Sequence, residues 1–256
     1  MKTEILNTLE HSKNLIISPD MDGFMTAKLI ERFNGSKIVG SYDKNILCLA
    51  DGIDPENCLF VDCDMNREVF VSLGNHMRLL DDAMSSKSFN PNVHFGVSTY
   101  TDKFPYATAF LISFATEVQT SEQDLIRMAF ADSTLRNMEK YSDNMRNWST
   151  RMNHDAVKYI TDNSDIARER DVQARFDYVD QSFTSKRYGK ERYLDTLNKA
   201  LADQEMAFEP LTNGVKYLCD KVGLNTVTRF GHDIISYAEI FGGEYSVTYD
   251  QEVDWK

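Results

Sequence analysis

The sequence has few cysteines and no long apolar run. Its four cysteines, Cys48, Cys58, Cys63 and Cys219, include no C-x-x-C pair, so neither a zinc knuckle nor a disulfide framework is predicted. No apolar segment approaches the roughly 20 residues that cross a bilayer, and residues 1–6 lack the charged-then-apolar pattern of a signal peptide. We therefore expect a cytoplasmic protein with reduced, mostly buried thiols and no membrane partner.

Basic side chains are also scarce. The chain has 28 Lys and Arg against 40 Asp and Glu, a net charge of −12. This excess of acid argues against a protein that coats duplex DNA, because such binding needs clustered cations to displace counterions. It is compatible with an acidic metal cleft, and with a short nucleotide held in a local basic pocket. The length of 256 residues permits one large domain or two modest ones.

The chain divides into two regions with different sequence patterns. Between residues 13 and 97, short β-rich runs alternate with helical ones. This alternation predicts an α/β fold, a parallel sheet with helices on both faces. Ligands of such sheets gather beyond the carboxyl ends of the strands. The predicted strands are 15–18, 37–42, 59–62 and 77–80, the predicted helices are 23–33 and 67–73, and 46–50 is ambiguous.

From residue 104 onward the pattern is helical, and it ends in an alternating segment typical of a short strand. We therefore predict an α/β domain over 1–135 and a mainly helical region over 136–256, which forms a lid or a second lobe. The predicted helices are 105–119, 121–132, 134–151, 155–162, 166–183, 191–208 and 210–222, and the predicted strand is 242–253.

The most informative motif is D-x-D-G, formed by Asp20, Asp22 and Gly23 after the apolar run 14–17. A strand that delivers carboxylates into a turn before a helix is a recurring way to build a metal or phosphate site. Two carboxylates two residues apart repel each other unless a cation lies between them. The motif therefore indicates a metal. The alternative is that both aspartates are turn and N-cap residues, where Asp is favoured anyway.

Three further candidate ligands lie at the ends of segments. Asp62 ends a second apolar strand, His76 precedes a third, and Asp132 ends an apolar helical run. An oxygen-rich set with one imidazole suits Mn²⁺ or Mg²⁺ better than a structural zinc. Each residue also has a plain interpretation: Asp62 as a helix cap, His76 as a core histidine and Asp132 as part of a turn between helices.

In this order the segments resemble the phosphoesterase superfamily named for its Asp-His-His motif, the DHH family. Its members include oligoribonucleases, single-strand exonucleases, cyclic-dinucleotide phosphodiesterases and manganese pyrophosphatases. The resemblance covers about residues 10–135. The family's four motifs correspond to Ser18-Pro19-Asp20-Met21-Asp22-Gly23, Asp62, Asn75-His76-Met77 and Asp132, and Asn90-Pro91-Asn92 with 103–108 look like the segment after the third motif.

The resemblance implies two metal ions, Mn or Mg, that share Asp62. One ion keeps all its ligands, which are Asp22, Asp62, His76 and Asp132. The second keeps Asp20 and Asp62 but has Ser18 where the family has a histidine. In the third motif, Asn75 replaces the aspartate, and Met77 replaces the histidine that meets substrate phosphate. The expectation is one firm ion and a weaker second one.

The leading hypothesis is a metal-dependent phosphoesterase that hydrolyses a short oligonucleotide, a cyclic dinucleotide or another small phosphorylated substrate through metal-activated water. The resemblance assigns catalysis to the metal ligands. Arg136 and Lys103 are candidate substrate contacts, and Tyr141 and Trp148 are candidates for base stacking. The catalytic and metal set is Asp20, Asp22, Asp62, His76 and Asp132.

Two alternatives stay open. The first is a degenerate family member that binds a nucleotide or a protein partner without hydrolysis, which Ser18, Asn75 and Met77 favour. The second is an unrelated α/β protein in which Asp20, Asp62 and His76 lie far apart. The glycine-rich Gly-Gly-Gly-His motif of the family's second domain has only a partial counterpart at 241–244, so we expect that domain to be replaced or absent. The sequence does not decide the oligomeric state, and a homodimer is compatible with it.

Overall fold

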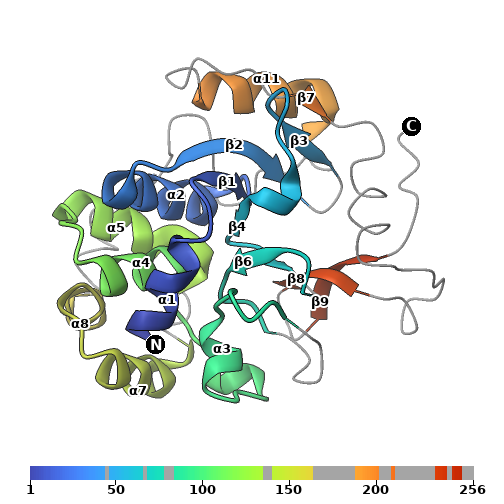
Figure 1. Cartoon of the computed structure of the whole chain (residues 1–256). Helices are drawn as coiled ribbons and strands as arrows, with labels where there is room; N and C mark the ends of the chain where they lie inside the picture. The colour runs from blue at the N-terminus through green and yellow to red at the C-terminus, as the bar shows by residue number, and fades with distance from the viewer. Residues whose placement is uncertain are drawn as a thin grey trace.

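The core of the molecule is a mostly parallel sheet in a mixed α/β fold (Figure 1). The computed structural model describes residues 1–43, 46–65, 68–77, 84–134, 140–163, 188–201, 209–210, 234–240 and 244–249. The six strands lie in the order β6-β4-β1-β2-β3-β7. Their bounds are β1 (Asn14–Ile17), β2 (Lys37–Tyr42), β3 (Leu47–Leu49), β4 (Leu59–Val61), β6 (Val71–Leu73) and β7 (Glu209–Pro210).

The direction of the strands confirms part of the sequence-based prediction. The strands β6, β4, β1 and β2 run parallel, whereas β3 is antiparallel to β2 and β7 is antiparallel to β3. The ambiguous segment 46–50 is therefore an antiparallel strand. The carboxyl ends of β1 and β4 lie side by side, because Ile17 pairs with Val61.

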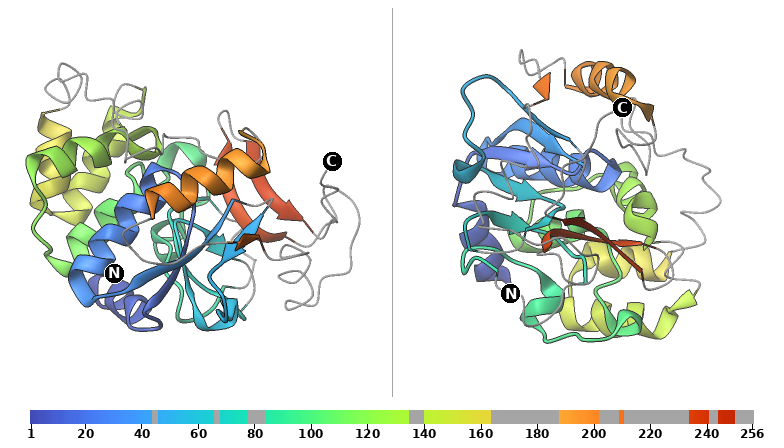
Figure 2. Two further views of the ribbon diagram at one scale, coloured as in Figure 1. Left: turned by 90° about the horizontal axis from the view of Figure 1, so that it is seen from above. Right: turned by 90° about the vertical axis from the view of Figure 1, so that its right-hand side faces the viewer.

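Helices pack mainly on one side of this sheet. Figures 1 and 2 place α4, α5, α7 and α8 on the opposite side of the molecule from strands β8 and β9. Among the described residues, no helix is long and apolar enough to cross a membrane. The bounds are α1 (Lys2–Leu9), α2 (Met21–Asn34), α3 (Pro91–His94), α4 (Thr108–Thr116), α5 (Glu122–Phe130), α7 (Ser142–Met152), α8 (Asp155–Asp162) and α11 (Lys190–Ala200), with short 3₁₀ turns at η1 (Pro55–Asn57), η2 (Tyr100–Asp102) and η3 (Ala131–Ser133).

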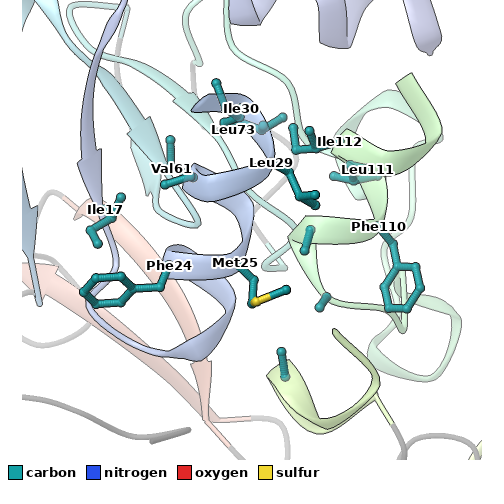
Figure 3. Close-up of a cluster of buried hydrophobic side chains, with 14 of the residues drawn as sticks. Ile17, Phe24, Met25, Leu29, Ile30, Val61, Leu73, Phe110, Leu111 and Ile112 are labelled. Carbon is teal, nitrogen blue, oxygen red and sulfur yellow. The ribbon is translucent and has the colours of Figure 1, made fainter. Parts of the chain in front are cut away.

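The main hydrophobic core lies between the sheet and the helices α2 and α4 (Figure 3). Strand residues Ile17 and Val61 meet Phe24 and Leu29 of α2 and Leu111 of α4, and all of them are at most 1% exposed. Burying a side chain of this size contributes roughly 1.5–3 kcal/mol. This packing fixes where α2 and α4 begin relative to the ends of β1 and β4.

A second hydrophobic cluster covers the other face of the sheet. It includes Ile16, Val39 and Phe60, which alternate with the residues of the main core along their strands. In the described part of the chain, no α-helix contributes a side chain to this cluster. Within the described residues, the prediction of helices on both faces is therefore confirmed for one face only.

Segments from the end of the chain add strands to the N-terminal half. A second sheet consists of β5 (Asp64–Met65), β8 (Ile234–Ile240) and β9 (Glu244–Tyr249), and β7 extends the main sheet beside β3. The helices beyond residue 135 also enter the main core, through Met145, Trp148 and Tyr193 among others. The division at residue 135 stays a prediction.

Several predicted elements differ from the structure. Residues 71–73 form strand β6 instead of the end of a helix, because Val71, Ser72 and Leu73 pair in parallel with β4; the neighbouring strand overrides local propensity. The helix expected to begin at Pro105 begins at Thr108, and β8 was not predicted. The predicted helix 166–183, residues 78–80 of the predicted strand, and most of the predicted helix 210–222 lie outside the described residues.

Three of the cysteines confirm the expectation of buried thiols. Cys48, Cys58 and Cys63 are buried. Burial raises the pKa of Cys48 and of Cys58 to about 12. Cys219 lies outside the described residues.

Candidate functional site

Four aspartates converge at the carboxyl edge of the sheet, and we call them the acidic cluster: Asp20, Asp22, Asp62 and Asp132. Asp20 follows β1 and Asp62 follows β4, so neighbouring parallel strands deliver both to one edge. Asp22 lies in the first turn of α2, and Asp132 follows α5. The hypothesis of chance motifs expected Asp20, Asp62 and His76 to lie far apart, whereas Asp20 and Asp62 lie close enough for their charges to interact.

The charges of the cluster act on one another. Burial, followed by repulsion from Asp132 and Asp20, raises the pKa of Asp22 from 3.8 to about 7. Burial, followed by repulsion from Asp22, Asp20 and Asp132, raises the pKa of Asp62 well above its ordinary value. A cation among these carboxylates would remove the repulsion that causes part of both shifts.

Asp22 caps the helix α4 from outside. The backbone N–H groups of Thr108 and Ala109 donate to its Oδ2 and Oδ1 at 2.6 and 3.0 Å, and Thr26 Oγ1 donates to Oδ1 at 3.1 Å. The N-cap position of α4, Ala107, supplies no side-chain cap of its own. The first turn of α4 therefore depends on a carboxylate from α2, which also matches the positive end of the helix dipole.

Thr108 joins Asp22 to Asp62. Its hydroxyl donates to Asp62 Oδ1 at 2.8 Å while its backbone N–H donates to Asp22. Thr108 is fully buried and heads the apolar run that becomes α4. This role of Thr108 was not predicted from the sequence, where the one signal is a hydroxyl residue at the start of an apolar helix without a capping residue before it.

The backbone at two members of the cluster is left-handed. Asp62 has φ of 55° and Asp132 has φ of 46°, a region that non-glycine residues seldom occupy. Asp132 belongs to the short turn η3 between helices, as the plain interpretation of this residue expected. The strained backbone turns both carboxylates out of the regular elements that precede them.

Asn75 lies beside Asp132 and has an unmatched oxygen. Its Nδ2 donates to Asp132 Oδ2 at 3.0 Å and to the Tyr106 carbonyl at 2.8 Å. Both partners are acceptors, so the orientation of the amide is fixed. Asn75 is fully buried, and its Oδ1 has no hydrogen-bond partner in the described structure. An unmatched buried acceptor costs about 1–3 kcal/mol, so a water or a ligand that donates to this oxygen would be stabilised beside the acidic cluster.

Asp20 is satisfied within its own turn. Ser18 Oγ donates to its Oδ2 at 2.8 Å, and the Gly23 N–H donates to its Oδ1 at 3.0 Å. This confirms the N-cap interpretation for Asp20. Gly23 is required here, because an added Cβ would overlap the carbonyl oxygen of Ser18. Where the DHH family has a histidine, this chain has a hydroxyl that binds Asp20.

His76 is buried and held by a carboxylate that the sequence analysis did not single out. Its Nδ1 lies 2.8 Å from Asp64 Oδ2, and its backbone N–H donates to the same oxygen at 2.9 Å. The preceding residue, Asn75, connects this turn to Asp132 of the acidic cluster. His76 is thus a well-anchored histidine whose ring is held by Asp64 and whose chain neighbour contacts the cluster.

The candidate substrate contacts have mixed outcomes. Lys103 is 9% exposed, and its Nζ lies 5.3 Å from the centre of the Tyr100 ring, whereas Arg136 lies outside the described residues. The prediction that Trp148 stacks against a base is wrong, because this residue is 2% exposed and its Nε1 donates to the Asp102 carbonyl. Tyr141 packs edge-on against Tyr100, with 6.1 Å between ring centres.

The chemistry of the donors suits a hard divalent cation such as Mn²⁺ or Mg²⁺, because carboxylates dominate and one imidazole lies nearby. Within the described ranges, however, no three His, Cys, Asp or Glu side chains are placed to hold an ion as they stand. The oxygens of Asp22 and Asp62 accept hydrogen bonds instead. The residues therefore fit a metal in kind, and coordination would require these side chains to turn.

No protein-family model, curated protein or solved structure matches this chain. The resemblance to the DHH family consequently rests on the ordered motifs alone, and it stays a prediction.

Proposed function

We propose that the protein is a metal-dependent phosphoesterase that hydrolyses a small phosphorylated substrate or a short oligonucleotide. The observation that carries the proposal is the convergence of four carboxylates at the carboxyl edge of a parallel sheet, next to the unmatched oxygen of Asn75. Buried carboxylates that repel one another are costly unless a proton or a cation accompanies them. Clusters of this kind are typical of functional sites.

The residues have unequal roles in this proposal. Asp22, Asp62, Asp132 and His76 would hold one Mn²⁺ or Mg²⁺. Asp20 is already engaged by Ser18 and Gly23, which disfavours a second ion. A divalent ion held by the first set of ligands would supply a Lewis acid and an ionised water near neutral pH.

The surrounding residues prepare the site. Thr108 orients Asp22 through its backbone and Asp62 through its hydroxyl. Asn75 orients Asp132 through Nδ2, and its Oδ1 is placed to accept a hydrogen bond from water or from a substrate hydroxyl. The net charge of −12 disfavours long polyanions and favours a short substrate.

One observation favours a second candidate, a binding protein without hydrolysis. Met77 is 2% exposed and belongs to the main hydrophobic core. It therefore cannot meet a substrate phosphate, as the histidine at this position does in the DHH family. Together with the satisfied turn at Asp20, this is the pattern expected if the chain kept the fold and lost the chemistry.

The test measures bound metal and turnover together. Protein purified in Mn²⁺ is assayed for metal content per chain, then for hydrolysis of a dinucleotide, a cyclic dinucleotide and pyrophosphate. We expect one ion per chain and turnover of at least one substrate. One bound ion without turnover favours the binding protein, and no bound ion overturns the metal-dependent phosphoesterase and also favours the binding protein.

The test variant is Asp62→Asn, and its matched control is Asp51→Asn. Asp62 belongs to the acidic cluster, and Asp51 is an exposed carboxylate outside it. We expect Asp62→Asn to lose metal and activity, and Asp51→Asn to keep both. Equal activity in both variants would contradict the assignment of the site.

A further inference from the structure

We infer that the acidic cluster holds a divalent ion through the water shell of the ion, and that Asn75 is one of the groups that accept hydrogen bonds from this shell. The inference rests on the proposed function for the presence of an ion. It adds how the ion is held and which oxygens hold it. Three oxygens carry the argument: Asp62 Oδ2, Asp132 Oδ1 and Asn75 Oδ1.

The other carboxylate oxygens of the cluster are committed to the protein. Asp20 accepts from Ser18 with one oxygen and from Gly23 with the other. Both oxygens of Asp22 accept backbone N–H groups from the start of α4. Asp20 and Asp22 therefore contribute charge to the site, while their oxygens hold a turn and a helix.

Three oxygens beside them accept no hydrogen bond from the described residues. Asp62 receives Thr108 Oγ1 at Oδ1, which leaves its Oδ2. Asp132 is half-buried and receives Asn75 Nδ2 at Oδ2, which leaves its Oδ1. The third is Oδ1 of the fully buried Asn75. It lies beside the carboxylates, because it shares one amide group with the nitrogen that donates to Asp132.

The amide of Asn75 cannot turn to satisfy its own oxygen. Its Nδ2 donates to Asp132 Oδ2 and to the Tyr106 carbonyl, and a reversed amide would place an acceptor against both. The site therefore presents a fixed neutral acceptor next to two carboxylate oxygens. A water shell offers donors in several directions, so it can satisfy all three oxygens without moving a side chain.

The spacing of the cluster also favours a hydrated ion. The four carboxylates lie close enough to repel one another. In the part of the chain that the structure describes, however, no three His, Cys, Asp or Glu side chains are placed to share an ion directly. A water molecule bridges such a gap, because it binds the ion through its oxygen and donates hydrogen bonds outward. Mg²⁺ suits this arrangement, since it loses its waters reluctantly and usually keeps several in proteins.

The test uses cobalt(III) hexaammine, an ion of nearly the size of hydrated Mg²⁺ whose ammonia ligands do not exchange. It donates N–H hydrogen bonds and cannot bind a carboxylate directly. Calorimetry on the whole chain, in about 0.15 M KCl to screen weak surface binding, measures its affinity and its competition with Mg²⁺. We expect it to displace Mg²⁺ from one site per chain and, because of its larger charge, to bind at least as tightly.

Two variants with the same change of charge decide which oxygens act. In Asp132→Asn the new amide keeps its oxygen toward Asn75 Nδ2, since an NH₂ group there would oppose a donor, so the open Oδ1 is replaced by a donor. Asp20→Asn removes one charge but no open acceptor. We expect the affinity for cobalt hexaammine to fall at least about tenfold more in Asp132→Asn, the size of one hydrogen bond to a charged group.

Both variants should fold. Asparagine is as good an N-cap as aspartate, which suits residue 20, and it tolerates the left-handed backbone found at Asp132. Asn75→Leu removes the third acceptor without a change of charge and should weaken cobalt hexaammine binding by about tenfold. It also leaves the Tyr106 carbonyl without a donor, so its thermal unfolding is measured alongside. If Asn75→Leu does not fold, the two aspartate variants decide the question.

The outcomes separate this inference from the proposed function. If Mg²⁺ binds and supports hydrolysis but cobalt hexaammine does not displace it, the ion has direct ligands, so the inference fails and the function stands. If both ions share the site without turnover, the inference stands and the hydrolytic function fails. Equal losses of affinity in Asp132→Asn and Asp20→Asn would show attraction by net charge alone and would overturn the inference. Absence of binding by either ion overturns both.

Discussion

Two turns beside the acidic cluster satisfy their polar groups in opposite ways. The turn at residues 18–23 is closed on itself, because Ser18 and Gly23 supply both donors to Asp20. The turn at residues 74–77 is held from a distance, by Asp64 of β5 and by the start of α3. It leaves Asn75 Oδ1 unmatched.

The difference separates a turn with a structural role from a turn that is arranged to receive a ligand. Asp20, whose carboxylate already has two donors in its own turn, gains less from a ligand than an unmatched atom does. A turn that is anchored by remote residues and keeps an unmatched buried acceptor carries a cost of about 1–3 kcal/mol that a ligand can remove. The binding function should therefore lie toward Asn75 and His76, away from Asp20.

The largest expected effect comes from Asp62, which lies between the two turns. Asp62→Asn should lower hydrolysis by at least about 1000-fold, more than the ~10–100-fold cost of losing an outer partner of a ligand. Thr108 Oγ1 can still donate to the amide oxygen, so the variant should fold. The measurement is kcat/KM with saturating Mn²⁺. Retained activity would place the chemistry away from the acidic cluster.

The second prediction concerns the pH dependence of stability without divalent ions. The pKa of Asp22 is about 7 in the folded protein against an ordinary 3.8, so the folded state binds more protons between these values. The contribution of Asp22 to stability should therefore be fully present below about pH 4 and should be lost as pH rises through about 7, by up to about 4 kcal/mol.

Thermal unfolding in a chelating buffer across this pH range measures the effect. Asp62→Asn should flatten the profile, because it removes one of the charges that interact with Asp22. Mn²⁺ should raise the melting temperature of the wild type at pH 8 and leave that of Asp62→Asn unchanged. A wild-type profile that rises with pH would contradict the burial of these charges.

Glycine replacements compare the two turns directly. Gly23→Ala should destabilise the protein by about 3 kcal/mol, because the new Cβ meets the Ser18 backbone, which cannot move aside. Gly74→Ala meets the Asp64 side chain, so it should displace this carboxylate and weaken Mn²⁺ binding at a smaller cost in stability. Chemical denaturation and calorimetry separate the two effects.

Gly35→Ala is the control for these variants. Gly35 has a φ of 75° and open space around its Cβ position, so it should cost only about 1 kcal/mol of backbone strain. If Gly23→Ala destabilised the protein no more than Gly35→Ala does, the inferred lack of space around Gly23 would be wrong.

The smallest effect is expected at Ser18. Ser18→Ala removes one hydrogen bond to Asp20 and should cost about 1 kcal/mol, with no change in the number of Mn²⁺ ions bound. Ser18→His restores the residue of the DHH motif and should add a second, weaker ion. Metal content by mass spectrometry distinguishes one ion from two, and a loss of Mn²⁺ in Ser18→Ala would assign Asp20 to the metal site.

The sequence predicted the acidic cluster because strand ends obey a simple rule. An apolar strand followed by an aspartate occurs at Asp20 and at Asp62, and parallel pairing brings such ends together. The capping role of Asp20 was also foreseen as the alternative. Local patterns were sufficient wherever the partner lies within a few residues.

What the sequence did not reveal depends on distant partners. Asp22 caps α4, a helix that begins at residue 108, and Asp64 holds His76 from another strand. Strand β6 forms because β4 lies beside it, although residues 67–73 also suit a helix. Such pairings follow from tertiary packing, which no local period encodes.

The left-handed backbone at Asp62 and Asp132 has a consequence for how the chain would respond to selection for stability. Glycine would occupy both positions with less strain and without charge, so selection for thermostability alone would favour it at each. Aspartate at these two positions therefore carries backbone strain and buried charge that glycine would avoid. A laboratory selection for heat resistance, with no demand for activity, should therefore lose these two side chains early.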